Sequence, residues 1–95
     1  MSNDTPLTIA QFQDHIHQRY FEADSARGKP ATFMWFIEEV GELATAMHGQ
    51  DRSNLEEEFA DVFAWLCTLA NISKIDLTQA VRKKYLQRNG PDGHK

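Results

Sequence analysis

The chain has 95 residues, which is the length of one domain, and neither a repeat nor a linker divides it. Hydrophobic residues make up 41% and charged residues 25%, as in ordinary soluble globular proteins. The 14 acidic and 10 basic residues give a formal net charge of −4, which argues against a broad electrostatic surface for DNA or RNA. One cysteine, Cys67, excludes an intrachain disulfide and a cysteine-based zinc site.

The first predicted helix begins with a capping box, because Thr8 is followed three residues later by Gln11. Apolar residues then recur at steps of three and four, which predicts an amphipathic helix as far as about Asp24. The segment 25–30 contains a glycine and a proline, and we expect it to end this helix.

Two further helices follow, and they carry most of the large apolar side chains. Thr32 is expected to cap the second helix, which ends near Gly49. Ser53 and Glu56 have capping-box spacing and predict the start of the third helix. The apolar residues cover more than one helical face, which predicts burial against a second subunit. They are Phe33, Met34, Trp35, Phe36, Ile37, Phe59, Phe63, Trp65 and Leu66.

A shorter fourth helix is predicted from Leu77 to about Arg88, because Asp76 and Gln79 again have capping-box spacing. No segment alternates with period two, so strands are not expected. The pattern as a whole predicts an all-α fold, a four-helix bundle completed by oligomerisation.

We expect a single domain over residues 1–95, with an ordered core at about 8–88. No apolar run approaches the about 20 residues that a membrane span needs. The first residues also lack the charged and apolar regions of a signal peptide. These features predict a cytoplasmic protein.

Four carboxylates stand at helical spacing in the second and third predicted helices. Glu39 and Glu42 are three residues apart and point within about 60° of each other, as do Glu58 and Asp61. Like charges on one helical face repel, so the spacing is unfavourable unless a cation or solvent screens it. Asp61 is the most informative, because apolar residues flank it and Asp is a poor residue for a helix interior.

Two interpretations of this acidic pattern are open. If the two helices pack antiparallel, the carboxylate pairs meet and form an oxygen-only site for a hard divalent cation such as Mg²⁺ or Mn²⁺. Alternatively, the carboxylates form the solvated face of a helical partner-binding module without enzymatic activity. The absence of a Glu-x-x-His pair disfavours a di-iron bundle.

The same residues resemble the signature of MazG-like nucleotide pyrophosphohydrolases. Its first half, Glu-Glu-x-x-Glu, matches residues 38–42, and its second half, Glu-x-x-Asp, matches residues 58–61. The resemblance covers roughly residues 8–88. It implies an all-α fold that forms a homodimer or homotetramer, with Mg²⁺ held by Glu39, Glu42, Glu58 and Asp61.

The resemblance also implies a reaction, the hydrolysis of a (deoxy)nucleoside triphosphate to the monophosphate and pyrophosphate. Glu38 and Glu39 are the implied catalytic residues. Glu38 matches the first Glu of the signature, and two roles are open for it, water activation and binding of a second metal ion. A phosphoribosyl-ATP pyrophosphohydrolase is the alternative within enzymes of this superfamily.

Five residues are candidates for substrate binding. Lys84 matches a basic position that contacts phosphate in relatives, and Arg88 stands where some relatives have Asn. Trp35 and Trp65 each lie one turn from a candidate metal ligand, and one or both are candidates for the walls of a base pocket; the alternative is a core position, which is more common for large aromatic residues at helical spacing. Arg27 precedes the acidic helix and is a candidate contact to phosphate or base, with an ordinary solvated charge as the alternative.

Overall fold

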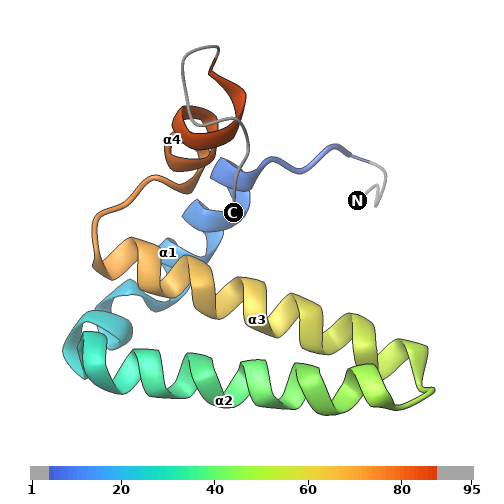
Figure 1. Cartoon of the computed structure of the whole chain (residues 1–95). Coiled ribbons are helices and arrows are strands. Elements are labelled where there is room, and N and C mark those ends of the chain that lie inside the picture. Colours follow the sequence, from blue (N-terminus) through green and yellow to red (C-terminus); the bar gives the residue numbers. More distant parts are fainter. Residues whose placement is uncertain (1–4, 88–95) are drawn as a thin grey trace.

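Four α-helices make up most of the computed structural model, which describes residues 5–87 (Figure 1). They are α1 (Ile9–Arg27), α2 (Lys29–His48), α3 (Arg52–Ile72) and α4 (Leu77–Val81), and one π-helical turn, η1 (Arg82–Leu86), follows α4. The described residues contain no strand, which confirms the predicted all-α fold. Within the same range, no helix has the length and apolar character needed to cross a membrane.

The predicted capping box at the start of α1 is confirmed. Thr8 Oγ1 accepts a hydrogen bond from the Gln11 backbone N–H at 3.0 Å, and Gln11 Oε1 accepts one from the Thr8 N–H at 2.8 Å. The helix continues to Arg27, one turn beyond the predicted end at Asp24. Its end is set by Gly28 alone, whose φ of +87° lies in the region that favours glycine.

Gly28 also begins α2, so the predicted cap at Thr32 is wrong. The helix starts at Lys29, with Pro30 in its first turn, where a missing N–H costs nothing. Thr32 lies inside α2 and is fully buried, and its hydroxyl donates to the Gly28 carbonyl at 2.6 Å. The chain therefore turns from α1 into α2 through a single residue.

The third helix begins earlier than its predicted box. Asp51 is the N-cap, because its Oδ1 accepts from the Asn54 N–H at 3.1 Å, so the prediction for Ser53 and Glu56 is wrong. The predicted cap of α4 is confirmed, with Asp76 Oδ1 accepting from the Gln79 N–H at 3.2 Å.

The fourth helix is α-helical over only the first part of its predicted length. It ends at Val81, and the chain continues as the π-helical turn η1 to Leu86. The predicted end at Arg88 lies outside the described residues.

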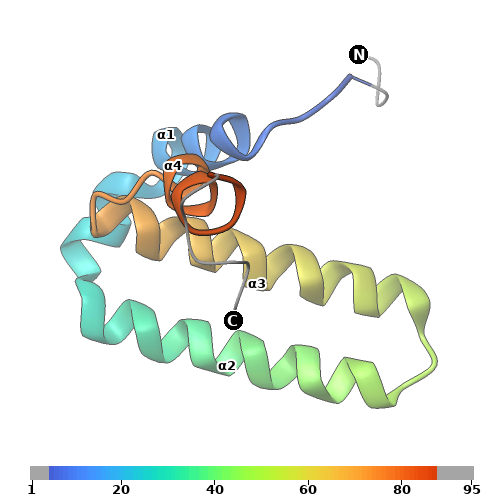
Figure 2. The same ribbon diagram turned by 45° about the horizontal axis from the view of Figure 1, so that its top comes forward.

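The long helices α2 and α3 run antiparallel as a hairpin (Figures 1 and 2). The third helix also packs against α1, whereas α1 and α2 touch little beyond the turn that joins them. The fourth helix rests on α1. This arrangement places the acidic segments of α2 and α3 side by side.

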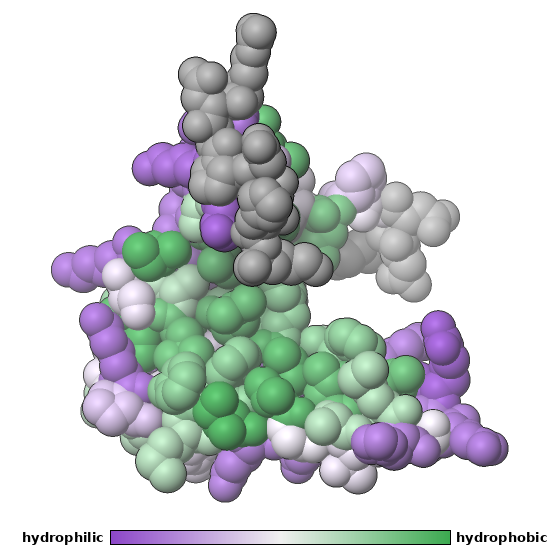
Figure 3. All heavy atoms as spheres, in the orientation of Figure 1, coloured by the Kyte–Doolittle hydropathy of each residue, from purple (hydrophilic) through white to green (hydrophobic). Residues whose placement is uncertain are grey.

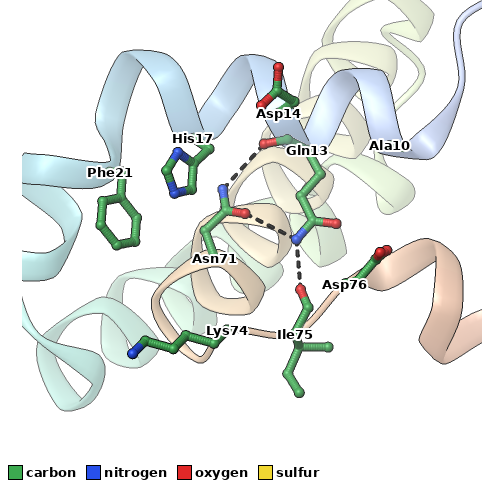
Figure 4. Close-up of a pocket in the computed structure, with 9 residues that line it drawn as sticks. All are labelled: Ala10, Gln13, Asp14, His17, Phe21, Asn71, Lys74, Ile75 and Asp76. Carbon is green, nitrogen blue, oxygen red and sulfur yellow. Dashed lines mark hydrogen bonds between the residues drawn. The ribbon is translucent and has the colours of Figure 1, made fainter.

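A buried amide pair fixes α1 to α3 and to the start of α4 (Figure 4). Gln13 Nε2 donates to Asn71 Oδ1 at 3.0 Å and to the Ile75 carbonyl at 2.7 Å, and Asn71 Nδ2 donates back to the Gln13 carbonyl at 3.3 Å. Gln13 Oε1 accepts from the Leu77 N–H at 3.0 Å. Because these amide groups are satisfied, burying them carries little penalty, and they set the register of three helices.

The core of the chain is small. Its buried hydrophobic residues are Ile16, Ala46, Cys67 and Ala70. Cys67 is fully buried, and burial raises the pKa of its thiol, which disfavours the reactive thiolate. Hydrophobic residues instead gather over the α2–α3 hairpin, on the face seen in Figure 3. The large exposed ones on these two helices lie on more than one side of the hairpin and are here together called the apolar face. They are Phe33, Met34, Trp35, Ile37, Val40, Met47, Phe59, Phe63 and Leu66.

Candidate functional site

Three carboxylates from two helices converge on the α2–α3 hairpin. Glu39 of α2 and Glu58 and Asp61 of α3 each offer an oxygen, and these three oxygens lie within 4.8 Å of one another. Glu58 and Asp61 meet because they are one turn apart on the same helix, and the antiparallel packing brings Glu39 beside them. We call these three residues the acidic cluster.

Glu42 adjoins this cluster from the turn after Glu39. Burial raises the pKa of Glu39, and a hydrogen bond with Glu42 and its charge raise it further. Desolvation also raises the pKa of Glu58, and the charges of Glu42 and Asp61 add to this effect. The folded chain therefore resists placing full negative charge on these side chains unless a positive charge accompanies it.

Asp61 is exposed, although apolar residues flank it in the sequence. The flanking Phe59 is itself 53% exposed, so this part of α3 belongs to a surface rather than to the core of one chain. Glu38 is exposed on α2 and belongs to no metal-binding group within the described residues.

The donor chemistry of the acidic cluster fits a hard divalent cation. Its three donors are carboxylate oxygens, the ligands that Mg²⁺ and Mn²⁺ prefer, and no thiol or imidazole takes part. Desolvation raises the pKa values of Glu39 and Glu58 most, and the charges of the neighbouring carboxylates raise them further; a cation bound there would oppose this second effect.

A pocket of about 360 Å³ opens beside the acidic cluster. Asp61 belongs to both, so a ligand in the pocket lies against one carboxylate of the cluster. The pocket is formed by α1, α2 and α3 and is lined by Ile16, Tyr20, Asp24, Arg27, Trp35, Asp61, Ala64 and Trp65.

Three of the predicted substrate-binding residues meet in this pocket. The rings of Trp35 and Trp65 lie with their centroids 5.6 Å apart and their planes inclined by 44°. The guanidinium carbon of Arg27 lies 5.6 Å from the Trp35 ring and 5.2 Å from the Trp65 ring. Both distances are within the range of a cation–π contact. Two indole rings therefore form a wall of the pocket, and the planar guanidinium of Arg27 lies against both of them.

Asp24 holds Arg27 in this position, and the sequence did not single it out. Asp24 Oδ1 forms an ion pair with Arg27 Nη1 at 3.1 Å, and Arg27 also donates to Thr32 Oγ1 at 3.2 Å. The available signal was the spacing of three residues between Asp24 and Arg27, which places them on one helical face. This spacing places the two residues on one face only because α1 continues to Arg27 instead of ending at Asp24.

The remaining candidates lie elsewhere. Lys84 is exposed on η1, and its ammonium lies 5.4 Å from the Tyr85 ring. No ion pair joins Lys84 to the acidic cluster within residues 5–87, and its contact to phosphate stays a prediction. Arg88 lies outside the described residues.

Comparison with known proteins gives the same assignment as the signature. The family model described as "MazG nucleotide pyrophosphohydrolase domain" matches residues 27–90, a range that includes the acidic cluster and both tryptophans. A dATP/dGTP diphosphohydrolase of cyanophage S-2L is 32% identical over 79 residues, which are 83% of this chain and 71% of that protein. These matches favour an enzyme over a partner-binding module. The chain belongs to the MazG nucleotide pyrophosphohydrolase family.

Proposed function

We propose that the protein hydrolyses (deoxy)nucleoside triphosphates to the monophosphate and pyrophosphate in the presence of Mg²⁺, for which Mn²⁺ can substitute. The observation that carries the proposal is the membership of Asp61 in both the acidic cluster and the tryptophan-walled pocket. A nucleotide whose base lies in this pocket has its phosphates on the side of the carboxylates.

The proposed cation ligands are Glu39, Glu58 and Asp61, with Glu42 beside them. A bound divalent cation would offset the negative charge of the triphosphate and polarise its phosphoryl oxygens. The chain itself supplies carboxylates that the packing of two helices brings together before substrate binds.

The proposed chemistry is attack of water on the α-phosphorus. The water oxygen forms a bond to this phosphorus, the bond from phosphorus to the bridging oxygen breaks, and pyrophosphate leaves. One proton of the water passes to a carboxylate, for which exposed Glu38, next to Glu39, is the proposed acceptor. The chain has no glycine-rich phosphate loop, so positioning rests on the carboxylates, with Lys84 as the proposed phosphate contact.

The pocket is the proposed site for the base. Two indole faces that already hold a planar guanidinium suit a planar heterocycle. The cyanophage relative is named for dATP and dGTP, so purine deoxynucleoside triphosphates are the substrates to test first.

The proposed working unit is a homodimer or homotetramer. The apolar face carries large side chains that one chain leaves in contact with water, and such surfaces mark association sites.

A screen of nucleoside triphosphates with detection of released pyrophosphate tests the proposal. Reactions with Mg²⁺, with Mn²⁺ and with excess EDTA should give pyrophosphate in the first two only. The Asp61→Asn variant serves as the inactive control. Hydrolysis that persists in EDTA, or no pyrophosphate from any triphosphate, would contradict the proposed function.

A further inference from the structure

Asp24 carries an unsatisfied acceptor in the pocket wall. The residue is 4% exposed, and one of its two carboxylate oxygens is paired with Arg27. The other, Oδ2, is shielded from solvent and has no hydrogen-bond partner within the described residues. Asp24 lines the pocket, and a buried carboxylate oxygen without a partner is costly, which points to a donor that reaches Oδ2 once a ligand has displaced the guanidinium of Arg27.

The position of Arg27 shows what kind of group the pocket accommodates. Its guanidinium is planar, lies against both indole rings and directs an N–H donor at Asp24. An aminopurine shares these three properties, because it is planar, stacks on aromatic rings and carries an amino group at its edge. A base that takes this place requires the guanidinium of Arg27, whose side chain is 26% exposed, to turn towards solvent.

We propose that Asp24 determines substrate specificity, with its Oδ2 accepting a hydrogen bond from the exocyclic amino group of a purine base stacked in the tryptophan pocket. The proposal rests on the proposed function and deepens it by naming the base class. A carboxylate accepts hydrogen bonds and donates none, so it pairs with an amino group and repels a carbonyl oxygen at the same place. Adenine and guanine both carry such an amino group, at different positions.

The competing interpretation is that Asp24 only anchors Arg27. An anchoring role needs one oxygen, which Oδ1 supplies, and it predicts no dependence of binding on the amino group of the base. The two interpretations therefore differ in a quantity that can be measured without catalysis.

The test compares nucleoside monophosphates that differ by one amino group. Deoxyadenosine monophosphate is paired with its analogue lacking the 6-amino group, and deoxyguanosine monophosphate with deoxyinosine monophosphate. Binding in the presence of Mg²⁺ is followed by tryptophan fluorescence, which reports on this pocket because the chain has 2 tryptophans and both line it.

In the wild-type protein, we expect at least one amino-bearing ligand to bind about ten-fold or more tightly than its partner, the size expected for a hydrogen bond to a charged group. The pair that shows the effect identifies the base. Asp24→Asn should reduce this ratio to near one, whereas Asp14→Asn, on an exposed aspartate of the same helix, should leave it unchanged.

Two results would overturn the inference. One is equal binding of both members of both pairs by the wild-type protein, which needs no variant to fold. The other is a ratio that survives in Asp24→Asn. If the protein hydrolyses triphosphates but binds both members of each pair equally, this inference is wrong and the proposed function stands. If it distinguishes the ligands by their amino group but hydrolyses no triphosphate, the proposed function is wrong and the role of Asp24 in binding stands.

Discussion

Trp35 and Trp65 face each other across the α2–α3 hairpin with ring centroids 5.6 Å apart, and each lies one helical turn from a carboxylate of the acidic cluster. Trp35 precedes Glu39 on α2, and Trp65 follows Asp61 on α3. Because helical neighbours four residues apart share a face, the packing that pairs the indoles also brings the carboxylates together. The tryptophan-walled pocket and the candidate metal site are therefore two consequences of one helix–helix contact.

Removing one wall of the pocket should weaken substrate binding more than turnover. In Trp35→Ala, we expect KM for the preferred triphosphate to rise about ten-fold, since stacking of a base on an aromatic side chain contributes roughly 1–3 kcal/mol. Trp35→Phe keeps an aromatic face and should recover most of the affinity. Steady-state kinetics on the three proteins measures this, and an unchanged KM in the alanine variant would remove Trp35 from the base pocket.

The acidic cluster should be essential for turnover but not for folding. Asp61→Asn should lower kcat/KM by at least about a hundred-fold, because it removes a charge that the proposed cation site requires. Its circular dichroism spectrum should stay helical. Glu56→Gln, an exposed position on the same helix outside the cluster, is the matched control and should retain activity. Near-normal turnover in Asp61→Asn would exclude the assignment.

The metal-free protein should become more stable when the cluster loses charge. Because the folded-state pKa of Glu39 is raised above its usual 4.5, the folded chain favours the protonated side chain, and its stability falls as pH rises through that pKa. In EDTA at pH 7, Glu39→Gln should therefore melt at a higher temperature than wild type.

Two further measurements on the wild type and Glu39→Gln check this explanation. The difference in Tm should vanish well below pH 4.5, where Glu39 is neutral in both the folded and the unfolded state. Adding Mg²⁺ should raise the Tm of the wild type more than that of Glu39→Gln. A variant that is less stable in EDTA and gains as much from Mg²⁺ as the wild type would show that Glu39 is not a ligand.

The apolar face should be covered in solution. Multi-angle light scattering at micromolar concentration should give a mass of at least twice the 10.9 kDa of one chain, because the exposed apolar side chains on α2 and α3 are too many for a stable monomer surface. Ile37→Glu places a charge on this face and should shift the mass towards the monomer. A wild-type mass near that of one chain would contradict the proposed oligomer.

The parts of the fold that sequence patterns predicted are those controlled by local signals. The capping box at Thr8 and the cap at Asp76 are each formed within one helical turn. The starts of α2 and α3 were misplaced because each has two candidate caps a few residues apart. For α2, the burial of Thr32 decided the choice, and burial depends on contacts that a short sequence window does not show. For α3, the spacing of Asp51 and Asn54 and that of Ser53 and Glu56 both permit a cap, and only the structure shows that Asp51 forms it.

In the candidate site too, local sequence patterns predict some residues and miss others. Glu39, Glu58 and Asp61 were predictable, because helical period and an antiparallel hairpin suffice to bring them together. The roles of Asp24 and of the buried pair Gln13 and Asn71 were not, since they depend on how α1 crosses α3. Contacts between segments distant in sequence leave no periodic pattern to detect.

The proposed reaction breaks the bond between the α-phosphorus and the bridging oxygen, and hydrolysis in ¹⁸O-labelled water tests this most directly. Attack at the α-phosphorus places the label in the nucleoside monophosphate and releases unlabelled pyrophosphate. Mass spectrometry of the products from the preferred triphosphate, with Mg²⁺ present, should show one ¹⁸O atom in the monophosphate. Label in pyrophosphate, or the formation of a nucleoside diphosphate and orthophosphate, would contradict the proposed reaction even if the carboxylates do bind the cation.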